Sequence, residues 1–152
     1  MYNGLLHLHS GLRWVILLLL LVAIFKSIAD LNKPFTNGHR RTGLFLMITA
    51  DIMLLVGLYQ WIAGSWGLKS IQANGMQNVM KNSVLRFFAI EHIVGMLVAI
   101  VLIHIGYALS KKSLPDKVKH RRVILFYGLA LLIILICIPW PFRMVGHGRG
   151  WF

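Results

Sequence analysis

Four long apolar stretches, separated by polar segments, dominate the chain. They cover about residues 5–25, 43–64, 87–109 and 123–140. Each stretch is long enough to cross about 30 Å of hydrocarbon as an α-helix. The pattern predicts an all-α membrane protein, a single domain over residues 1–152 in which four transmembrane helices form an antiparallel bundle.

The composition agrees with this prediction. Hydrophobic residues make up 58% of the chain, charged residues only 13%, and the mean hydropathy is +0.73. A water-soluble domain carries roughly twice this share of charged residues, which excludes a soluble enzyme, a disordered chain and a fibrous protein. The single Cys137 lies inside an apolar stretch, so the chain has no disulfide framework and no thiolate metal site.

The net charge of +12 comes from 16 basic and 4 acidic residues. In a soluble protein it would suggest nucleic acid as a partner. Here the basic residues lie in short segments beside apolar stretches, so we expect contacts with membrane lipids and no nucleic acid.

The basic residues also predict the orientation of the helices. Residues 26–41 and 111–122 hold ten of them, and the opposite side holds six. The positive-inside rule therefore places both termini outside, which in a bacterium means a multi-pass inner (cytoplasmic) membrane protein with both termini on the periplasmic side. Residues 65–85, also outside, partly fit a short helix on the membrane surface, and a flexible loop is the alternative.

A short repeat suggests that a helical hairpin is duplicated. Residues 39–45 read HRRTGLF and residues 120–126 read HRRVILF, with five of seven positions identical at an offset of 81. The match predicts two hairpins of parallel topology, although basic residues also gather by chance at inner helix ends. If the duplication holds, His9 and His92 are pseudo-equivalent, because they precede the two repeats by 30 and 28 residues.

Ionisable residues inside membrane spans are costly, so each is a candidate functional residue. An outer layer holds His9, Arg13, Glu91 and His92. Two imidazoles at equal depth on facing helices are what bis-histidine ligation of haem iron requires. The pattern predicts haem b bound by His9 and His92, with Arg13 beside a propionate and Glu91 in the same site.

Other interpretations of this layer remain open. The histidines could extend to the interface, and Arg13 with Glu91 could be an interhelical ion pair. A copper or zinc ion could take ligands from the same cluster, namely His7, His9, Glu91, His92 and His147. Gly11 and Gly95 could leave room for a flat macrocycle.

A second, inner layer holds Asp51 and His104. Helix rise places both about 10–15 Å from the inner surface. They could form a pair that relays protons or binds a quinone head, or a polar clamp that fixes helix packing. His39 and His120 lie in basic segments and are expected at the interface.

Three segments resemble a known family. Residues 9–14 (HSGLRW), 91–96 (EHIVGM) and 138–143 (IPWPFR) are similar to those of small bacterial four-helix membrane proteins commonly labelled "cytochrome B". The resemblance covers nearly the whole chain and implies one haem near the outer face. The chain departs from two-haem cytochromes b, because its first helix has no second, inner histidine.

These observations favour a membrane electron-transfer subunit of cytochrome b type, an accessory protein rather than an enzyme. It would hold one haem between the first and third helices and exchange electrons with a quinol or a protein. The alternative is a non-catalytic structural or assembly subunit of a larger membrane complex, respiratory or transport. A transporter that uses Asp51 and His104 is a third hypothesis. Other membrane subunits or further copies of the chain are the expected partners.

Overall fold

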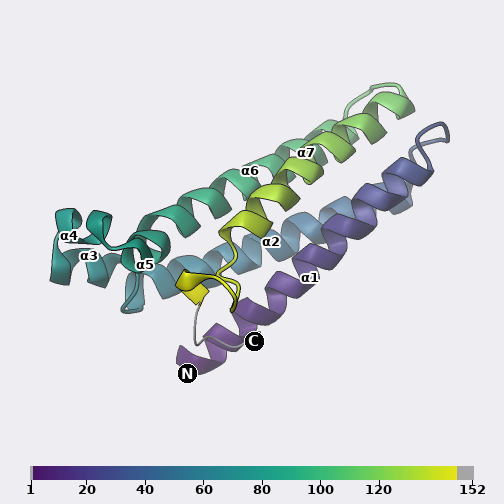
Figure 1. Cartoon of the computed structure of the whole chain (residues 1–152). Coiled ribbons are helices and arrows are strands. Elements are labelled where there is room, and N and C mark those ends of the chain that lie inside the picture. Colours follow the sequence, from purple (N-terminus) through teal and green to yellow (C-terminus); the bar gives the residue numbers. More distant parts are fainter. Residues whose placement is uncertain (1, 147–152) are drawn as a thin grey trace.

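The structure, a computed structural model, describes residues 2–146. The described residues form helices and no strand. Four helices are long and apolar enough to cross a membrane, which confirms the predicted spans (Figure 1). They are centred on α1 (Tyr2–Ala29), α2 (Asn37–Ala63), α6 (His92–Lys111) and α7 (Asp116–Cys137).

The helices differ from the predicted bounds mainly at the basic segments. α2 and α7 begin six and seven residues earlier than the apolar stretches, because a helical backbone satisfies its own hydrogen bonds whatever the polarity of its side chains. At the start of α2, the backbone N–H of Thr36 donates to Nδ1 of His39 at 3.2 Å. α7 ends at Cys137 and not at residue 140, because the residue before Pro139 disfavours the helical conformation.

The connection between α2 and α6 consists of short helices. α3 (Leu68–Asn74), α4 (Met76–Lys81) and α5 (Ser83–Arg86) follow one another, and Gly75 takes a φ of 74° at the corner between α3 and α4. Residues 65–85 are therefore largely helical, in three short helices and not the single short helix that was one of the two alternatives. A π-helical turn, Phe87–Glu91, then leads into α6.

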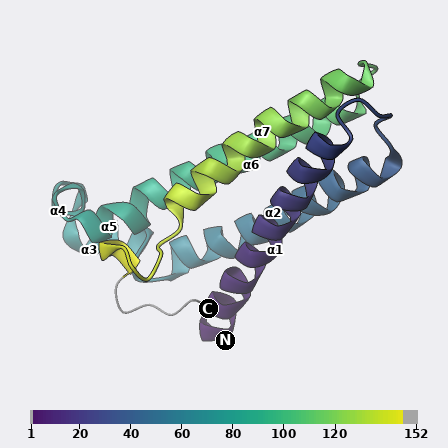
Figure 2. The same ribbon diagram turned by 45° about the vertical axis from the view of Figure 1, so that its right-hand side comes forward.

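The four long helices pack as neighbours in the order α1, α2, α6, α7, with α7 also against α1. Figures 1 and 2 show the loops 30–36 and 112–115 together at one end, which we call the basic end. The N-terminus and α3–α5 lie at the other, the terminal end. Fully buried side chains between the helices include Leu20, Leu46, Ile103 and Tyr127.

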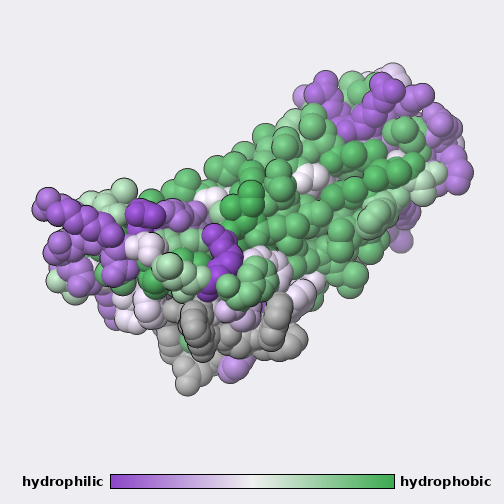
Figure 3. All heavy atoms as spheres, in the orientation of Figure 1, coloured by the Kyte–Doolittle hydropathy of each residue, from purple (hydrophilic) through white to green (hydrophobic). Residues whose placement is uncertain are grey.

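The surface of the helices is apolar around the middle of the molecule and hydrophilic at both ends (Figure 3). Large apolar side chains such as Leu18, Phe25, Leu55 and Ile136 are more than half exposed. So many exposed apolar side chains are unfavourable in water and suit a lipid environment. The chain is therefore a multi-pass membrane protein.

A cluster of rings closes the basic end, where we expected His39 and His120 simply at the interface. Both are buried instead, with ring centroids 4.8 Å apart, and the Phe35 ring lies 4.9 Å from each. Asp30 Oδ2 is 3.2 Å from Nε2 of His39, and a hydrogen bond from Lys33 lowers the pKa of the Asp30 carboxyl below its usual value. The cluster joins the two hairpins because each contributes one histidine.

Candidate functional site

A cavity of about 440 Å³ lies between the helices toward the terminal end. Its wall is mainly apolar, with side chains such as Ile16, Leu54, Met96 and Ile100, and all four long helices contribute to it. The volume falls in the range of about 300–1,000 Å³ that is typical of small-molecule and cofactor sites. Bundles commonly hold cofactors in this position.

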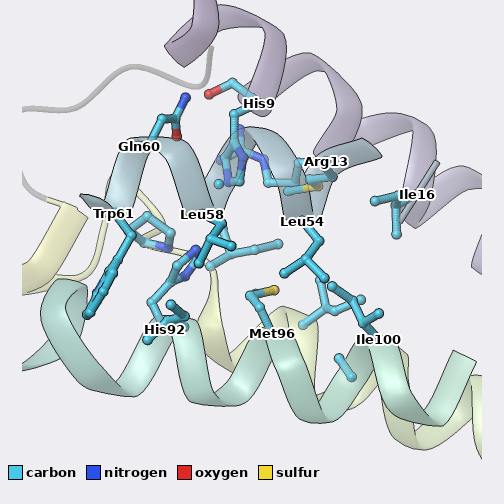
Figure 4. Close-up of a pocket in the computed structure, with 18 of the residues that line it drawn as sticks. His9, Arg13, Ile16, Leu54, Leu58, Gln60, Trp61, His92, Met96 and Ile100 are labelled. Carbon is cyan, nitrogen blue, oxygen red and sulfur yellow. The ribbon is translucent and has the colours of Figure 1, made fainter. Parts of the chain in front are cut away.

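His9 of α1 and His92 of α6 face each other across this cavity (Figure 4). Their ring centroids are 6.3 Å apart, and the ring planes make an angle of 59°. The structure thus brings together the two histidines that the sequence placed at equal depth on separate helices.

The imidazole of His92 is oriented by the backbone of α7. Its Nδ1 lies 2.8 Å from the carbonyl oxygen of Cys137. A carbonyl can only accept, so Nδ1 donates and carries the proton, and Nε2 keeps its lone pair. A metal-binding histidine is commonly held in this way by its second nitrogen.

The π-helical turn before His92 affects the position of this side chain. The backbone N–H of His92 bonds to the carbonyl of Phe87, five residues earlier, and not to that of Phe88. The wider turn changes the rotation of the residues before His92 relative to α6. Such turns frequently occur at functional sites, and no residue pattern in the sequence signalled this one.

His9 lies against the backbone of α2 at Gly57. A Cβ at position 57 would lie 3.0 Å from Cε1 of His9, so the ring lies closer to α2 than a side chain at position 57 would normally allow. Nδ1 of His9 is buried and has no hydrogen-bond partner among the described residues. A buried polar nitrogen without a partner is unfavourable, so His9 Nδ1 marks a place where a bound group could contact the wall.

Glycine makes room in this site, but at a different position from the two we expected. A Cβ at Gly11 would have nothing within 4 Å, and one at Gly95 would collide with Sγ of Cys137 on α7. Gly95 therefore lets α6 and α7 approach each other, whereas Gly57 lines the cavity. The sequence showed Gly57 only as one of several glycines in the spans.

Two side chains of α2 tie the walls of the cavity together. Gln60 Nε2 donates to the carbonyl of Leu5 on α1 at 2.7 Å, and Trp61 Nε1 donates to the carbonyl of Ala89 in the π-helical turn at 2.9 Å. These bonds position the segments that carry the two histidines. Gln60 was not among the predicted site residues, although an amide side chain inside an apolar stretch is a signal that the sequence contains.

Arg13 lines the cavity one turn beyond His9, and its guanidinium lies 5.3 Å from the centre of the Trp14 ring. Glu91 does not line the cavity. Its carboxylate is half exposed and accepts a hydrogen bond from Nε of Arg86 at 2.6 Å. Glu91 therefore lies outside the cavity wall, because Glu91 and His92, as adjacent residues, point in different directions.

The structure also bears on the copper or zinc alternative. His7 lines the cavity, whereas His147 lies outside the described residues. Within residues 2–146, no group of three or more histidine, cysteine or acidic side chains could hold a metal ion. The described wall of the cavity thus carries the imidazoles of His7, His9 and His92 without a chelating cluster.

Asp51 of α2 and His104 of α6 form the pair that the sequence allowed. Nε2 of His104 is 3.2 Å from Oδ1 of Asp51. Thr49, two residues before Asp51, donates its hydroxyl to the carbonyl of Phe45 instead of to this pair. Neither Asp51 nor His104 lines the cavity, so the pair is a separate feature.

The cavity therefore combines two opposed imidazoles and one guanidinium with a mainly apolar wall, to which the polar side chains of His7, Ser10 and Gln60 also belong. This set of groups suits a largely apolar ligand that has a metal centre and an anionic edge. No protein-family model, no curated protein and no solved structure matches the chain.

Proposed function

We propose that the chain is a membrane electron-transfer subunit that holds one b-type haem between His9 and His92. The observation that carries the proposal is the pair of imidazoles facing each other across one apolar cavity, with centroids 6.3 Å apart. The residues of the site fit this cofactor in three respects.

The first is distance. Metal–imidazole bonds are about 2 Å long and a ring nitrogen lies about 1 Å from its ring centre, so two rings on opposite sides of one iron have centroids about 6 Å apart. The observed separation agrees with this value. Two imidazoles are also a complete axial ligand set for a b-type haem, so a third protein ligand is not needed.

The second respect is the state of the two rings. The bond from Nδ1 of His92 to Cys137 leaves Nε2 as the ligand atom. His9 has a buried nitrogen without a hydrogen-bond partner among the described residues, and a bound group would end this unfavourable state.

The third respect is charge. Haem is a flat apolar ring with two carboxylates, and Arg13 is the basic side chain among those lining the cavity. Its guanidinium would pair with a propionate. When bound, the haem supplies reversible one-electron oxidation and reduction, while the protein sets the orientation, the polarity and the access of water.

A reduced-minus-oxidised visible spectrum of the detergent-purified protein tests the proposal. We expect a b-type α band and one haem per chain. His9→Ala and His92→Ala should each abolish the band in protein that circular dichroism shows to be folded. Glu91→Gln, adjacent to His92 but outside the cavity wall, should keep it. A folded wild-type protein without haem, after expression with ample haem, would contradict the proposal.

The second candidate is a non-catalytic structural or assembly subunit of a larger membrane complex. It is favoured by the small size of the described parts outside the four spans, since α3, α4 and α5 have only seven, six and four residues. Co-purification from gently solubilised membranes tests it. A stable monomer without partners would contradict it, and a stable association with other subunits would support it.

In this proposal, the four spans form an antiparallel bundle that arose by duplication of a helical hairpin. Its support is that residues at corresponding positions of the two halves meet twice: His9 with His92 near the terminal end, and His39 with His120 at the basic end. A duplication followed by packing of the two copies about a common axis explains both pairs.

In this proposal, the cofactor site lies near the periplasmic face of a bacterial inner membrane, because the positive-inside rule places the opposite, basic end in the cytoplasm. Gln72→Cys in a Cys137→Ser protein tests the orientation. Gln72 is exposed on α3, so an impermeant thiol reagent should label it in intact spheroplasts. Labelling only after the membrane is broken would reverse the orientation.

A further inference from the structure

The Asp51–His104 pair lies at hydrocarbon depth and at the surface of the helix bundle. Asp51 is ten residues beyond Arg41 on α2, and His104 is seven residues before Lys111 on α6, which gives depths of about 10–15 Å from the basic end. The side chains of Asp51 and His104 are 44% and 41% exposed. The pair therefore faces the lipid and not the core.

The neighbouring side chains support this orientation. Ile52 and Leu55 on α2 and Val101 and Ile105 on α6 are all exposed apolar residues. An isolated charge among them would be costly, so the protonation state of the pair matters.

The contacts of His104 fix how many protons the pair holds. Its Nδ1 lies 2.9 Å from the carbonyl of Ile100, so Nδ1 carries a proton. The 3.2 Å between Nε2 and Oδ1 of Asp51 is a hydrogen-bond distance, and such a bond needs a second proton on one of these two atoms. Whichever atom holds this second proton, the pair has no net charge, which is the form that lipid favours.

One oxygen of the pair remains available. No described residue donates to Oδ2 of Asp51. The pair thus presents an acceptor to the lipid, next to a proton held between two titratable groups. A matching ligand must dissolve in the membrane and carry a hydroxyl donor on a polar head.

We propose that Asp51 and His104 bind the head of a membrane quinol, with a quinol hydroxyl donating to Oδ2 of Asp51. A quinol combines a phenolic hydroxyl with an apolar body, and it reaches the pair by lateral diffusion in the bilayer. A clamp that only fixed α2 against α6 would be enclosed between the helices, whereas more than two-fifths of each side chain is exposed. The proposal concerns binding alone and does not depend on haem in the cavity.

The proton between the two side chains gives a direct probe. Dicyclohexylcarbodiimide reacts with protonated carboxyl groups in apolar surroundings. The chain has only four acidic side chains, Asp30, Asp51, Glu91 and Asp116, so mass spectrometry can assign the modified residue. In phosphatidylcholine liposomes we expect modification of Asp51, and several-fold slower modification when duroquinol is present.

Variants separate the acceptor from the proton. Asp51→Asn keeps a side-chain oxygen that accepts, so duroquinol should still bind saturably although labelling is lost. Asp51→Leu should lose both the labelling and the binding of duroquinol. Glu91→Gln should keep both, because the wild-type Glu91 carboxylate pairs with Arg86, away from Asp51. The labelling should persist in His9→Ala, which separates this site from the haem proposal.

Two results would overturn the inference, and both come from the wild-type protein, whose folding is not in question. If the carbodiimide leaves Asp51 unmodified, the pair does not hold a lipid-accessible proton. If Asp51 is modified at a rate that duroquinol does not change, the pair is a polar clamp and not a quinol site.

Discussion

Gly57→Ala should weaken haem binding without destabilising the helices. The added Cβ would lie 3.0 Å from Cε1 of His9, whereas ordinary contacts of this kind lie at 3.4–4 Å. The ring must therefore move by at least about 0.4 Å, the difference between 3.4 and 3.0 Å. A functional site tolerates only about 0.5 Å of displacement, so this shift is close to the limit.

The stability of the protein should change in the opposite direction. Alanine is favoured over glycine inside a helix by up to about 1 kcal/mol, and the atoms that the new Cβ meets belong to a side chain that can move. We therefore expect an unchanged or higher melting temperature together with a haem affinity about tenfold lower, the lower limit of what loss of an orienting contact costs a metal site. Few substitutions separate the two quantities in this way.

The assay is haem titration of the purified apoprotein, with thermal unfolding followed by circular dichroism. Gly11→Ala is the matched control, because Gly11 lies on α1 beside His9 and a Cβ there meets nothing within 4 Å. Gly57→Val should have a larger effect than Gly57→Ala. A Gly57→Val protein that binds haem as tightly as wild type would refute the reasoning.

Three further predictions follow from the packing and the charge of the bundle. Gly106→Ala should lower the free energy of unfolding by about 1–3 kcal/mol through overpacking, because its Cβ would lie 2.5 Å from Cε1 of the buried Tyr127. Gly128→Ala is the control: a Cβ there would have nothing within 4 Å, so this variant should be neutral or stabilising in the same unfolding assay. Phe35→Ala should lower the free energy of unfolding by about 3–5 kcal/mol, since its buried ring contacts both histidines of the basic end. A decrease below about 1 kcal/mol would mean that this cluster does not hold the two hairpins together. Arg13→Gln should shift the haem midpoint potential to a more negative value in a redox titration, because a positive charge near the haem favours its reduced form. An unchanged potential would contradict the pairing of Arg13 with the haem.

The spans could be predicted from the sequence because lipid imposes a strong and simple condition. A helix must stay apolar over about 20 residues to cross the bilayer, and this condition is visible in any window of the chain. The helix ends were less predictable. They depend on local bonds such as that between Thr36 and His39, which hydropathy does not report.

The rotation of each helix about its own axis could not be predicted. In a soluble protein the polar face of a helix shows which side meets water, but here both lipid and core accept apolar side chains. The adjacent residues Glu91 and His92 show the consequence. Only the structure tells that His92 faces the cavity while Glu91 pairs with Arg86.

Pairing across the bundle was predictable where two polar residues had nowhere else to go. Asp51 and His104 are costly in hydrocarbon unless they meet, and they do meet. The repeat could have predicted the contact of His39 with His120 in the same way as that of His9 with His92, because both pairs occupy equivalent positions in the two halves. This contact was not predicted, because the basic residues beside His39 and His120 made a location at the membrane interface the simpler interpretation.

The two proposed sites share α2 and α6 but lie at different depths. Gly57, which seats His9, is six residues from Asp51 on α2, and His92 is twelve residues from His104 on α6, which separates the sites by about 9–18 Å along the helices. A quinol bound at Asp51 and a haem held by His9 and His92 would thus occupy one short stretch of the bundle. Because α2 and α6 are packed neighbours, a ligand that shifts them at one site should change binding at the other. Haem affinity measured with and without duroquinol therefore connects the two proposals: reciprocal coupling would make the chain one functional unit, whereas independent binding would leave two separate sites on one scaffold.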